Sequence, residues 1–227
     1  MSKRQASGLT ALAAFFALSG CIGGSGGADG PVGTSPFWLN ASAPRAMQAD
    51  GVTIVGPSGF CIDPGATQAS DDVRFALLGS CASLANSATH GKPRKAAVLS
   101  ASLGPTGGLS VSENSAALTA LLSGPQGRAL LATDGGGAVT VHETAVDDGV
   151  ILVHASDPGL TAARQLEPDY WRGFFDLDGR VVTLSVFSLP GRQSLTDKAG
   201  QSLLMSFVAA MRQANAEASV PDQVTES

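Results

Sequence analysis

The dipeptide Asp178-Gly179, set between two runs of alternating apolar residues, constrains the fold of this chain most strongly. An Asp-Gly pair suits a two-residue type I′ turn, a common connection in β-hairpins. With that turn Phe175 faces Val182 and Trp171 faces Val186, so that one face of both strands is apolar. The sequence therefore predicts an antiparallel sheet with Trp171 in its core.

A second predicted hairpin brings two histidines together. Asp147-Asp148-Gly149 suits a three-residue loop with glycine in the left-handed third position, and this register places His142 opposite His154. Two imidazoles about 5 Å apart at Cβ could share a transition metal, with Asp157 or Glu143 as candidate third ligands. The alternative is an exposed or helix-covered histidine pair without metal, because Thr140 and Thr144 give the same face a solvated character. A two-residue loop would instead place the two rings on opposite faces.

The other segments predict short strands and helices in no strict βαβ order. Strands are expected at 52–55, 60–62, 96–103 and 128–132, and helices at 113–122 and 195–215. Ser70 suits a helix N-cap, and Val73, Leu77, Cys81 and Leu84 recur at helical spacing after it. The expected fold class is α+β, a mainly antiparallel sheet with helices packed on one face.

The first residues have the pattern of an export signal. Lys3 and Arg4 precede an apolar run at 9–18 that is too short to span a membrane, and Leu18-Ser19-Gly20-Cys21 follows. This tetrapeptide resembles the lipobox of bacterial lipoproteins. The resemblance implies cleavage before Cys21, a diacylglycerol on its thiol and acylation of the new amine. The alternatives are an ordinary secretory signal or a short membrane anchor.

The resemblance also implies a location and a domain plan. Position 22 is Ile rather than Asp, which in Gram-negative families implies sorting to the outer membrane, with the protein facing the periplasm. The signal peptide is expected at 1–20, and 21–36 is expected to be a lipidated cysteine with a Gly-rich tether. A single domain is expected at 37–216 and a disordered tail at 217–227.

Cys61 and Cys81 are predicted to form a disulfide, because an exported chain enters an oxidising compartment. Closing a loop of about twenty residues would stabilise the fold by roughly 3 kcal/mol. Two buried free thiols are the alternative.

Charge and motifs limit the function. The net charge of −5 argues against a nucleic-acid partner, and neither a phosphate-binding glycine motif nor a complete catalytic motif is found. Tyr170 and Arg172, which flank Trp171, are left to face outward. The sequence predicts a non-catalytic, lipid-anchored module that binds or assembles with another envelope protein and needs no cofactor. The alternatives are a periplasmic hydrolase or metal-dependent enzyme that uses His142 and His154, or a carrier with a cleft between sheet and helices.

Overall fold

The computed structural model describes residues 43–67, 75–132 and 138–218, so the predicted signal peptide, Cys21 and the tether lie outside the described residues. The strands are β1 (Ala46–Ala49), β2 (Val52–Val55), β3 (Phe60–Ile62), β4 (Phe75–Ser80), β5 (Ala97–Leu103), β6 (Thr140–Asp147), β7 (Val150–Ser156), β8 (Asp169–Leu177) and β9 (Arg180–Ser188). The helices are α1 (Cys81–Leu84), α2 (Ser115–Ser123), α3 (Pro125–Leu131), α4 (Pro158–Arg164), the 3₁₀ helix η1 (Gly191–Gln193) and α5 (Asp197–Ala218). Across these ranges, no helix combines the length and the apolar character needed to cross a bilayer.

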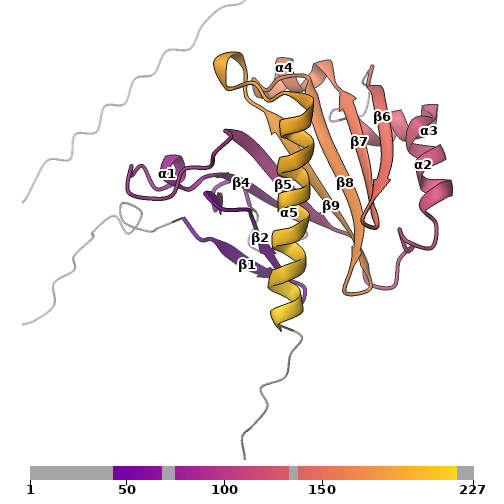
Figure 1. Ribbon diagram of the computed structural model, residues 1–227, viewed down its shortest axis with the longest axis horizontal. Helices are drawn as coiled ribbons and strands as arrows, with labels where there is room; N and C mark the ends of the chain where they lie inside the picture. Colours follow the sequence, from indigo (N-terminus) through magenta and orange to yellow (C-terminus); the bar gives the residue numbers. More distant parts are fainter. Residues whose placement is uncertain (1–42, 68–74, 133–137, 219–227) are drawn as a thin grey trace, which may run out of the picture. The chain divides into compact units, whose positions relative to one another are not determined.

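Seven strands form one antiparallel sheet in the order β3-β4-β5-β9-β8-β7-β6, and β1 and β2 form a separate two-stranded sheet (Figure 1). The β8–β9 hairpin has the predicted register, with Phe175 opposite Val182 and Trp171 opposite Val186. Both residues of its turn, Asp178-Gly179, have positive φ, as a type I′ turn requires. The α+β class and the antiparallel sheet are thereby confirmed.

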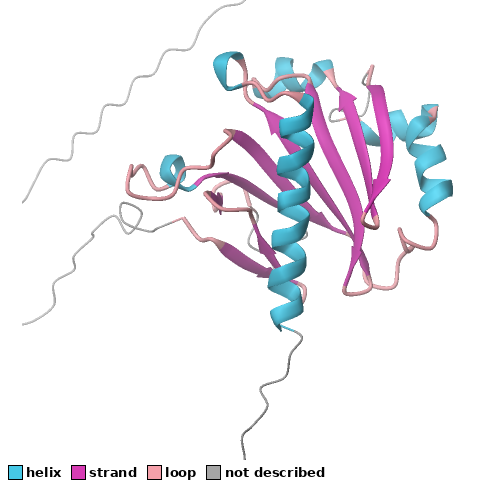
Figure 2. Ribbon diagram, in the orientation of Figure 1, coloured by secondary structure: helices cyan, strands magenta, loops and turns pink. Residues whose placement is uncertain are grey.

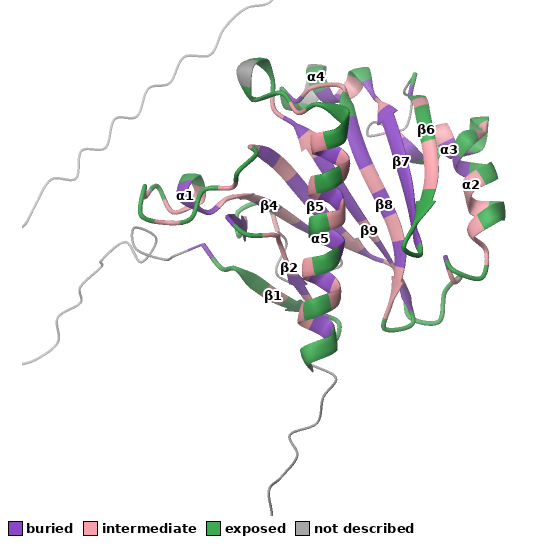
Figure 3. Cartoon of the chain, in the orientation of Figure 1, coloured by how far each residue is buried: buried purple, intermediate pink, exposed green. Residues whose placement is uncertain are grey.

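Helices cover both faces of the large sheet, although the sequence predicted them on one face. β7 shows this most directly, because it is buried along nearly its whole length (Figure 3). Val150 and Leu152 pack in the cluster that contains residues of α5, whereas Ile151 and Val153 pack in the cluster that contains residues of α2, α3 and α4. Successive strand residues point to opposite faces, so a strand that is buried throughout needs cover on each side.

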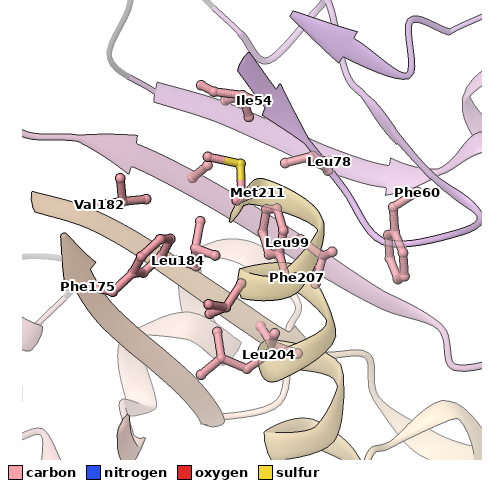
Figure 4. Close-up of a cluster of buried hydrophobic side chains, with 14 of the residues drawn as sticks. Ile54, Phe60, Leu78, Leu99, Phe175, Val182, Leu184, Leu204, Phe207 and Met211 are labelled. Atoms are coloured by element: carbon pink, nitrogen blue, oxygen red, sulfur yellow. The ribbon is translucent and has the colours of Figure 1, made fainter. Parts of the chain in front are cut away.

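The larger core lies between α5 and the sheet, and Figure 2 shows this helix passing in front of the strands. Leu204, Phe207 and Met211 of α5 are fully buried in one cluster with Leu99 of β5 and Leu184 of β9 (Figure 4). Burying one such side chain stabilises the fold by about 1.5–3 kcal/mol. This packing places the first residue of α5, Asp197, beside His154 of β7.

Two elements differ in type from the sequence-based prediction. The stripe through Leu77 and Cys81 was expected to be helical, but Phe75–Ser80 is the strand β4, which pairs with β3 on one edge and β5 on the other. Pairing with β3 and β5 makes this segment a strand, although its apolar residues recur at helical spacing. The segment 128–132 was expected to be a strand, but it continues the helix α3, which has Pro125 in its first turn.

The remaining element-level predictions differ only at their ends or are confirmed. The strands predicted at 52–55, 60–62 and 96–103 correspond to β2, β3 and β5, and the helix predicted at 113–122 corresponds to α2. The last helix, α5, extends to Ala218, two residues into the segment predicted to be a disordered tail. Ser70 and Val73 lie outside the described residues.

The predicted disulfide is present. The Sγ atoms of Cys61 and Cys81 are 2.03 Å apart, and the bond joins β3 to the first residue of α1. Both cysteines are almost completely buried. Cys81 follows β4 directly, so the bond joins β3 to the short helix α1 at the end of the neighbouring strand and not to a long helix.

Candidate functional site

The two histidines meet, but for a different reason from the predicted one. The β6–β7 turn has two residues, Asp148-Gly149, because Asp147 pairs with Val150. That register alone would place the imidazoles on opposite faces. A β-bulge between Val141 and Glu143 inserts one residue, His142, so that the two rings lie on the same side with their centroids 5.0 Å apart.

Two aspartates complete this histidine cluster. Oδ1 of Asp169, at the start of β8, lies 3.6 Å from Nε2 of His142 and 3.8 Å from Nε2 of His154. Oδ1 of Asp197, the first residue of α5, is also 3.8 Å from Nε2 of His154. His142 Nε2 is in addition 2.8 Å from the hydroxyl of Ser156. The carboxylates that lie at the histidines are thus those of Asp169 and Asp197, and not the candidate third ligands Asp157 and Glu143.

The candidate ligands Asp157 and Glu143 have other environments. Asp157 is fully buried and caps α4, where its Oδ1 accepts a hydrogen bond of 2.8 Å from the backbone N–H of Gly159. Glu143 is exposed on β6. Sequence reasoning missed Asp169 and Asp197, because both are brought to the histidines by long-range packing and no local turn specifies their register.

The histidine cluster is a set of hydrogen-bond and charge interactions. Among the described residues, no group of three or more His, Cys, Asp or Glu side chains has an arrangement that could hold a metal ion. His154 is 8% exposed, and its ring is stacked on Trp171 with centroids 4.8 Å apart and planes 5° from parallel. Either imidazole, when protonated, can pair with the carboxylate of Asp169. The arrangement thus links β6, β7, β8 and the first turn of α5.

A small polar cavity adjoins this cluster. It has a volume of about 80 Å³ and is lined by His154, Asp169, Trp171 and Asp197, among others. One water takes up about 30 Å³ in the liquid, so the cavity is suited to a few waters and is too small for an organic substrate of ordinary size. Trp171 Nε1 is buried here without a hydrogen-bond partner among the described residues.

A much larger hollow lies on the opposite face of the sheet, between the sheet and the helices α2 and α3. Its volume is about 480 Å³. A second hollow of about 370 Å³ lies between the sheet and α4. The two share three lining residues, Phe75, Ser100 and Arg172, and together we call them the groove. Pockets for small organic molecules commonly have volumes of about 300–1,000 Å³.

The groove carries most of the large exposed apolar side chains of the described residues. Phe75 is 42% exposed, Leu109 56%, Leu121 39% and Leu130 69%, and all four line the larger hollow. The fifth large exposed apolar residue, Val146, lies on β6 and does not line it. A contiguous apolar surface on a soluble domain commonly marks a site of interaction.

Arg172 and Tyr170 lie on the floor of this face, although the sequence predicted that both would face outward. Tyr170 is 2% exposed, and its hydroxyl donates a hydrogen bond of 3.1 Å to the backbone carbonyl of Leu131, at the end of α3. Arg172 Nε donates to the hydroxyl of Ser185 at 3.0 Å, and Nη1 donates to the Leu131 carbonyl at 3.4 Å. Trp171, which points the other way, is in the core as predicted.

Burial changes the pKa values of Tyr170 and Arg172. Loss of solvent lowers the pKa of Arg172, and the nearby Tyr170 and Asp157 oppose that change. Loss of solvent raises the pKa of Tyr170, while the Arg172 charge lowers it. Arg172 takes part in none of the ion pairs found among the described residues. The floor of the groove thus holds a poorly solvated positive charge.

Comparison with known proteins finds no family model that matches the chain and no curated protein with significant sequence similarity to it.

Proposed function

We propose that this protein is a lipid-anchored, non-catalytic binding module of the bacterial envelope, and that the groove binds a small apolar or amphipathic molecule. The observation that carries the binding proposal is the 480 Å³ hollow lined by four large exposed apolar side chains. The anchor is supported by the lipobox-like segment that ends at Cys21. A protein partner in the envelope remains the prediction made from the sequence.

Transfer of apolar surface out of water is favourable by about 25 cal/mol per Å², so an apolar ligand gains free energy by covering Leu109, Leu121 and Leu130. The sheet beneath them is a rigid floor, because β5, β9 and β8 are each hydrogen-bonded to a neighbouring strand on both edges. A preformed site of this kind loses little conformational entropy on binding.

The test is titration of the full chain carrying Cys21→Ser with the uncharged fluorescent probe N-phenyl-1-naphthylamine. We expect saturable binding of one probe per chain. The double variant Leu121→Glu, Leu130→Glu should weaken it by about tenfold or more, since a charge would have to be desolvated beside the bound probe. Val146→Glu is the matched control and should bind as the parent does. Absence of saturable binding would refute the proposal.

The alternative, a periplasmic hydrolase or metal-dependent enzyme or carrier, is favoured by one observation, the proximity of His142 and His154 to Asp169. Its test is addition of one equivalent of Zn²⁺ or Cu²⁺ during thermal unfolding. We expect no saturable rise in melting temperature. A rise that disappears in His142→Gln and at a pH where the imidazoles are protonated would support the metal site instead.

A further inference from the structure

We infer that the groove is selective for an amphipathic anion, whose apolar chain occupies the hollow under α2 and α3 and whose carboxylate or phosphate is held by Arg172. This inference rests on the proposed function, because it names the class of ligand for the same groove. Its starting point is the position of one charge on the sheet floor, which is otherwise lined by apolar and hydroxyl side chains. The exposed Arg164 of α4 adds a second cation at the smaller hollow.

Arg172 lies where the two hollows join, since it lines both of them. Its register partners in the sheet are neutral, because they are Ser185 on β9 and Val153 on β7. Its guanidinium lies 5.0 Å from the ring centroid of Tyr170, and Asp157 is the acidic residue whose charge acts on it. Among the described residues it has hydrogen bonds only to a hydroxyl and a backbone carbonyl, and no ion pair. A guanidinium has five N–H donors in a fork that matches a carboxylate or phosphate.

A row of hydroxyl groups leads to this guanidinium across the sheet. Ser100 on β5 is the register partner of Ser185 on β9, and Ser185 is the register partner of Arg172 on β8. Ser102 and Thr183 form the next pair along the same two strands and also line the larger hollow. Hydroxyls can donate to the oxygens of an anionic head group, so the row supplies further donors beside the charge.

The rest of the groove excludes a wholly polar anion. Leu118, Leu121, Leu122 and Leu130 from α2 and α3 face the floor across the larger hollow. A free inorganic phosphate would leave this apolar lining in water. A molecule with a polar head and an apolar tail satisfies both parts, because the tail covers the leucines and the head compensates the desolvated charge.

Arg172 also has a structural role, which the experiment must separate from ligand binding. Its bond to the Leu131 carbonyl helps to satisfy the C-terminal end of α3, where a cation is favourable. Removal of the side chain could therefore lower stability without any ligand. The informative quantity is the difference in affinity between a charged and an uncharged ligand of the same length.

The experiment measures displacement of N-phenyl-1-naphthylamine from the full chain carrying Cys21→Ser by three ligands with the same chain length. These are dodecanoate, dodecyl phosphate and the uncharged methyl dodecanoate. We expect at least one anion to bind about tenfold more tightly than the ester, as one charge-assisted contact would provide. The comparison of the two anions shows whether a carboxylate or a phosphate is preferred.

Variants then assign the difference to Arg172. In Arg172→Met the ratio of the affinity for the anion to the affinity for the ester should fall to about one. The affinity for methyl dodecanoate should stay within about twofold of the parent, because an apolar side chain of similar length still fills this part of the groove. Arg172→Lys should restore part of the preference. Arg45→Gln, which removes an exposed arginine outside the groove, is the control for net charge and should behave as the parent.

The outcomes separate the two proposals. If the probe and the ester bind but the parent protein shows no preference for either anion, the inference is wrong and the proposed function stands. This result is decisive even if Arg172→Met fails to fold, because it needs no variant. If neither the probe nor any of the three ligands binds, the proposed function itself fails. An anion preference that persists unchanged in a folded Arg172→Met would also overturn the inference.

Discussion

Asp176 on β8 shows how one carboxylate can order a loop that is remote in sequence. It accepts hydrogen bonds of 2.8 Å from the backbone N–H groups of Val111 and Ser112, and of 2.9 and 2.8 Å from the hydroxyls of Ser110 and Ser112. Desolvation raises the pKa of Asp176, but these hydrogen bonds together outweigh it, so the pKa is lowered. The loop that they hold leads into α2 and carries Val111, which lines the groove.

The lowered pKa predicts how stability depends on pH. A group whose pKa is lower in the folded state contributes stability above its unfolded pKa, and that contribution is lost as the pH falls through the folded pKa. Asp176→Asn should therefore be less stable than the parent at pH 7, on the order of 1–2 kcal/mol for the lost charged hydrogen bonds. The difference should shrink when urea unfolding is repeated at acidic pH, and a difference that is independent of pH would contradict the assignment.

The histidine cluster shows what residue-level sequence reasoning can and cannot reach. The turn chemistry of Asp148-Gly149 indicated a hairpin, and the pairing of His142 with His154 was predicted from a loop length that was wrong. The bulge restores the contact between His142 and His154 because it shifts the register by one residue, and the local sequence does not predict it. Asp169 and Asp197 reach the cluster through the packing of β8 and α5. Local sequence patterns do not predict this packing, because it joins segments that are distant in the chain.

At the scale of elements, predictions succeeded where local chemistry decides and failed where packing decides. The Asp178-Gly179 turn fixes its own strands, so the register of β8 and β9 followed from the sequence. The segment of β4 fits helical and strand spacing alike, and only its neighbours β3 and β5 settle the choice. The groove could not be predicted for the same reason, because its lining comes from five strands, three helices and two loops whose arrangement in space local sequence patterns do not specify.

The packing of α5 against the sheet makes a prediction about Gly200. A Cβ atom at this position would lie 2.6 Å from Trp171 Cδ1, closer than side chains tolerate. Alanine has a helix propensity about 1 kcal/mol better than glycine, so on propensity alone Gly200→Ala should stabilise α5. We expect the clash to prevail and the melting temperature to fall, because Trp171 is held between His154 and the helix. Ser202→Ala, on the exposed side of α5, is the control.

If Gly200→Ala raises the melting temperature as far as helix propensity alone would, α5 and Trp171 are not in close contact in solution. The near-ultraviolet circular dichroism of the variant reports on the tryptophan environment and should change in Gly200→Ala but not in Ser202→Ala.

At the scale of the whole molecule, the anchor and the groove are complementary. If Cys21 carries the acyl chains, the folded domain needs no membrane-binding surface of its own. Removal of residues 1–20 would take away Lys3 and Arg4 and no acidic residue, which makes the mature chain more acidic than the net charge of −5 of the whole chain. Such a body would tend to stand off from an anionic membrane surface, and the apolar groove would remain free for a ligand.

Lipidation at Cys21 predicts a specific defect when the thiol is removed. Cys21→Ser should either accumulate as unprocessed precursor or appear as soluble protein in the periplasmic fraction, because neither the diacylglycerol nor the amine-linked chain can be added. A single acyl chain gives only marginal membrane binding and about 0.8 kcal/mol is gained per buried methylene, so loss of all chains should abolish stable association.

The measurement is fractionation of envelope and soluble material, with labelled palmitate followed in parallel. The double variant Cys61→Ser, Cys81→Ser, which removes the disulfide and leaves the lipobox-like segment intact, is the control for loss of cysteine elsewhere, and it should keep its label and stay with the membrane. Membrane association and palmitate labelling that persist in a correctly processed Cys21→Ser chain would show that the lipobox-like segment is not the anchor.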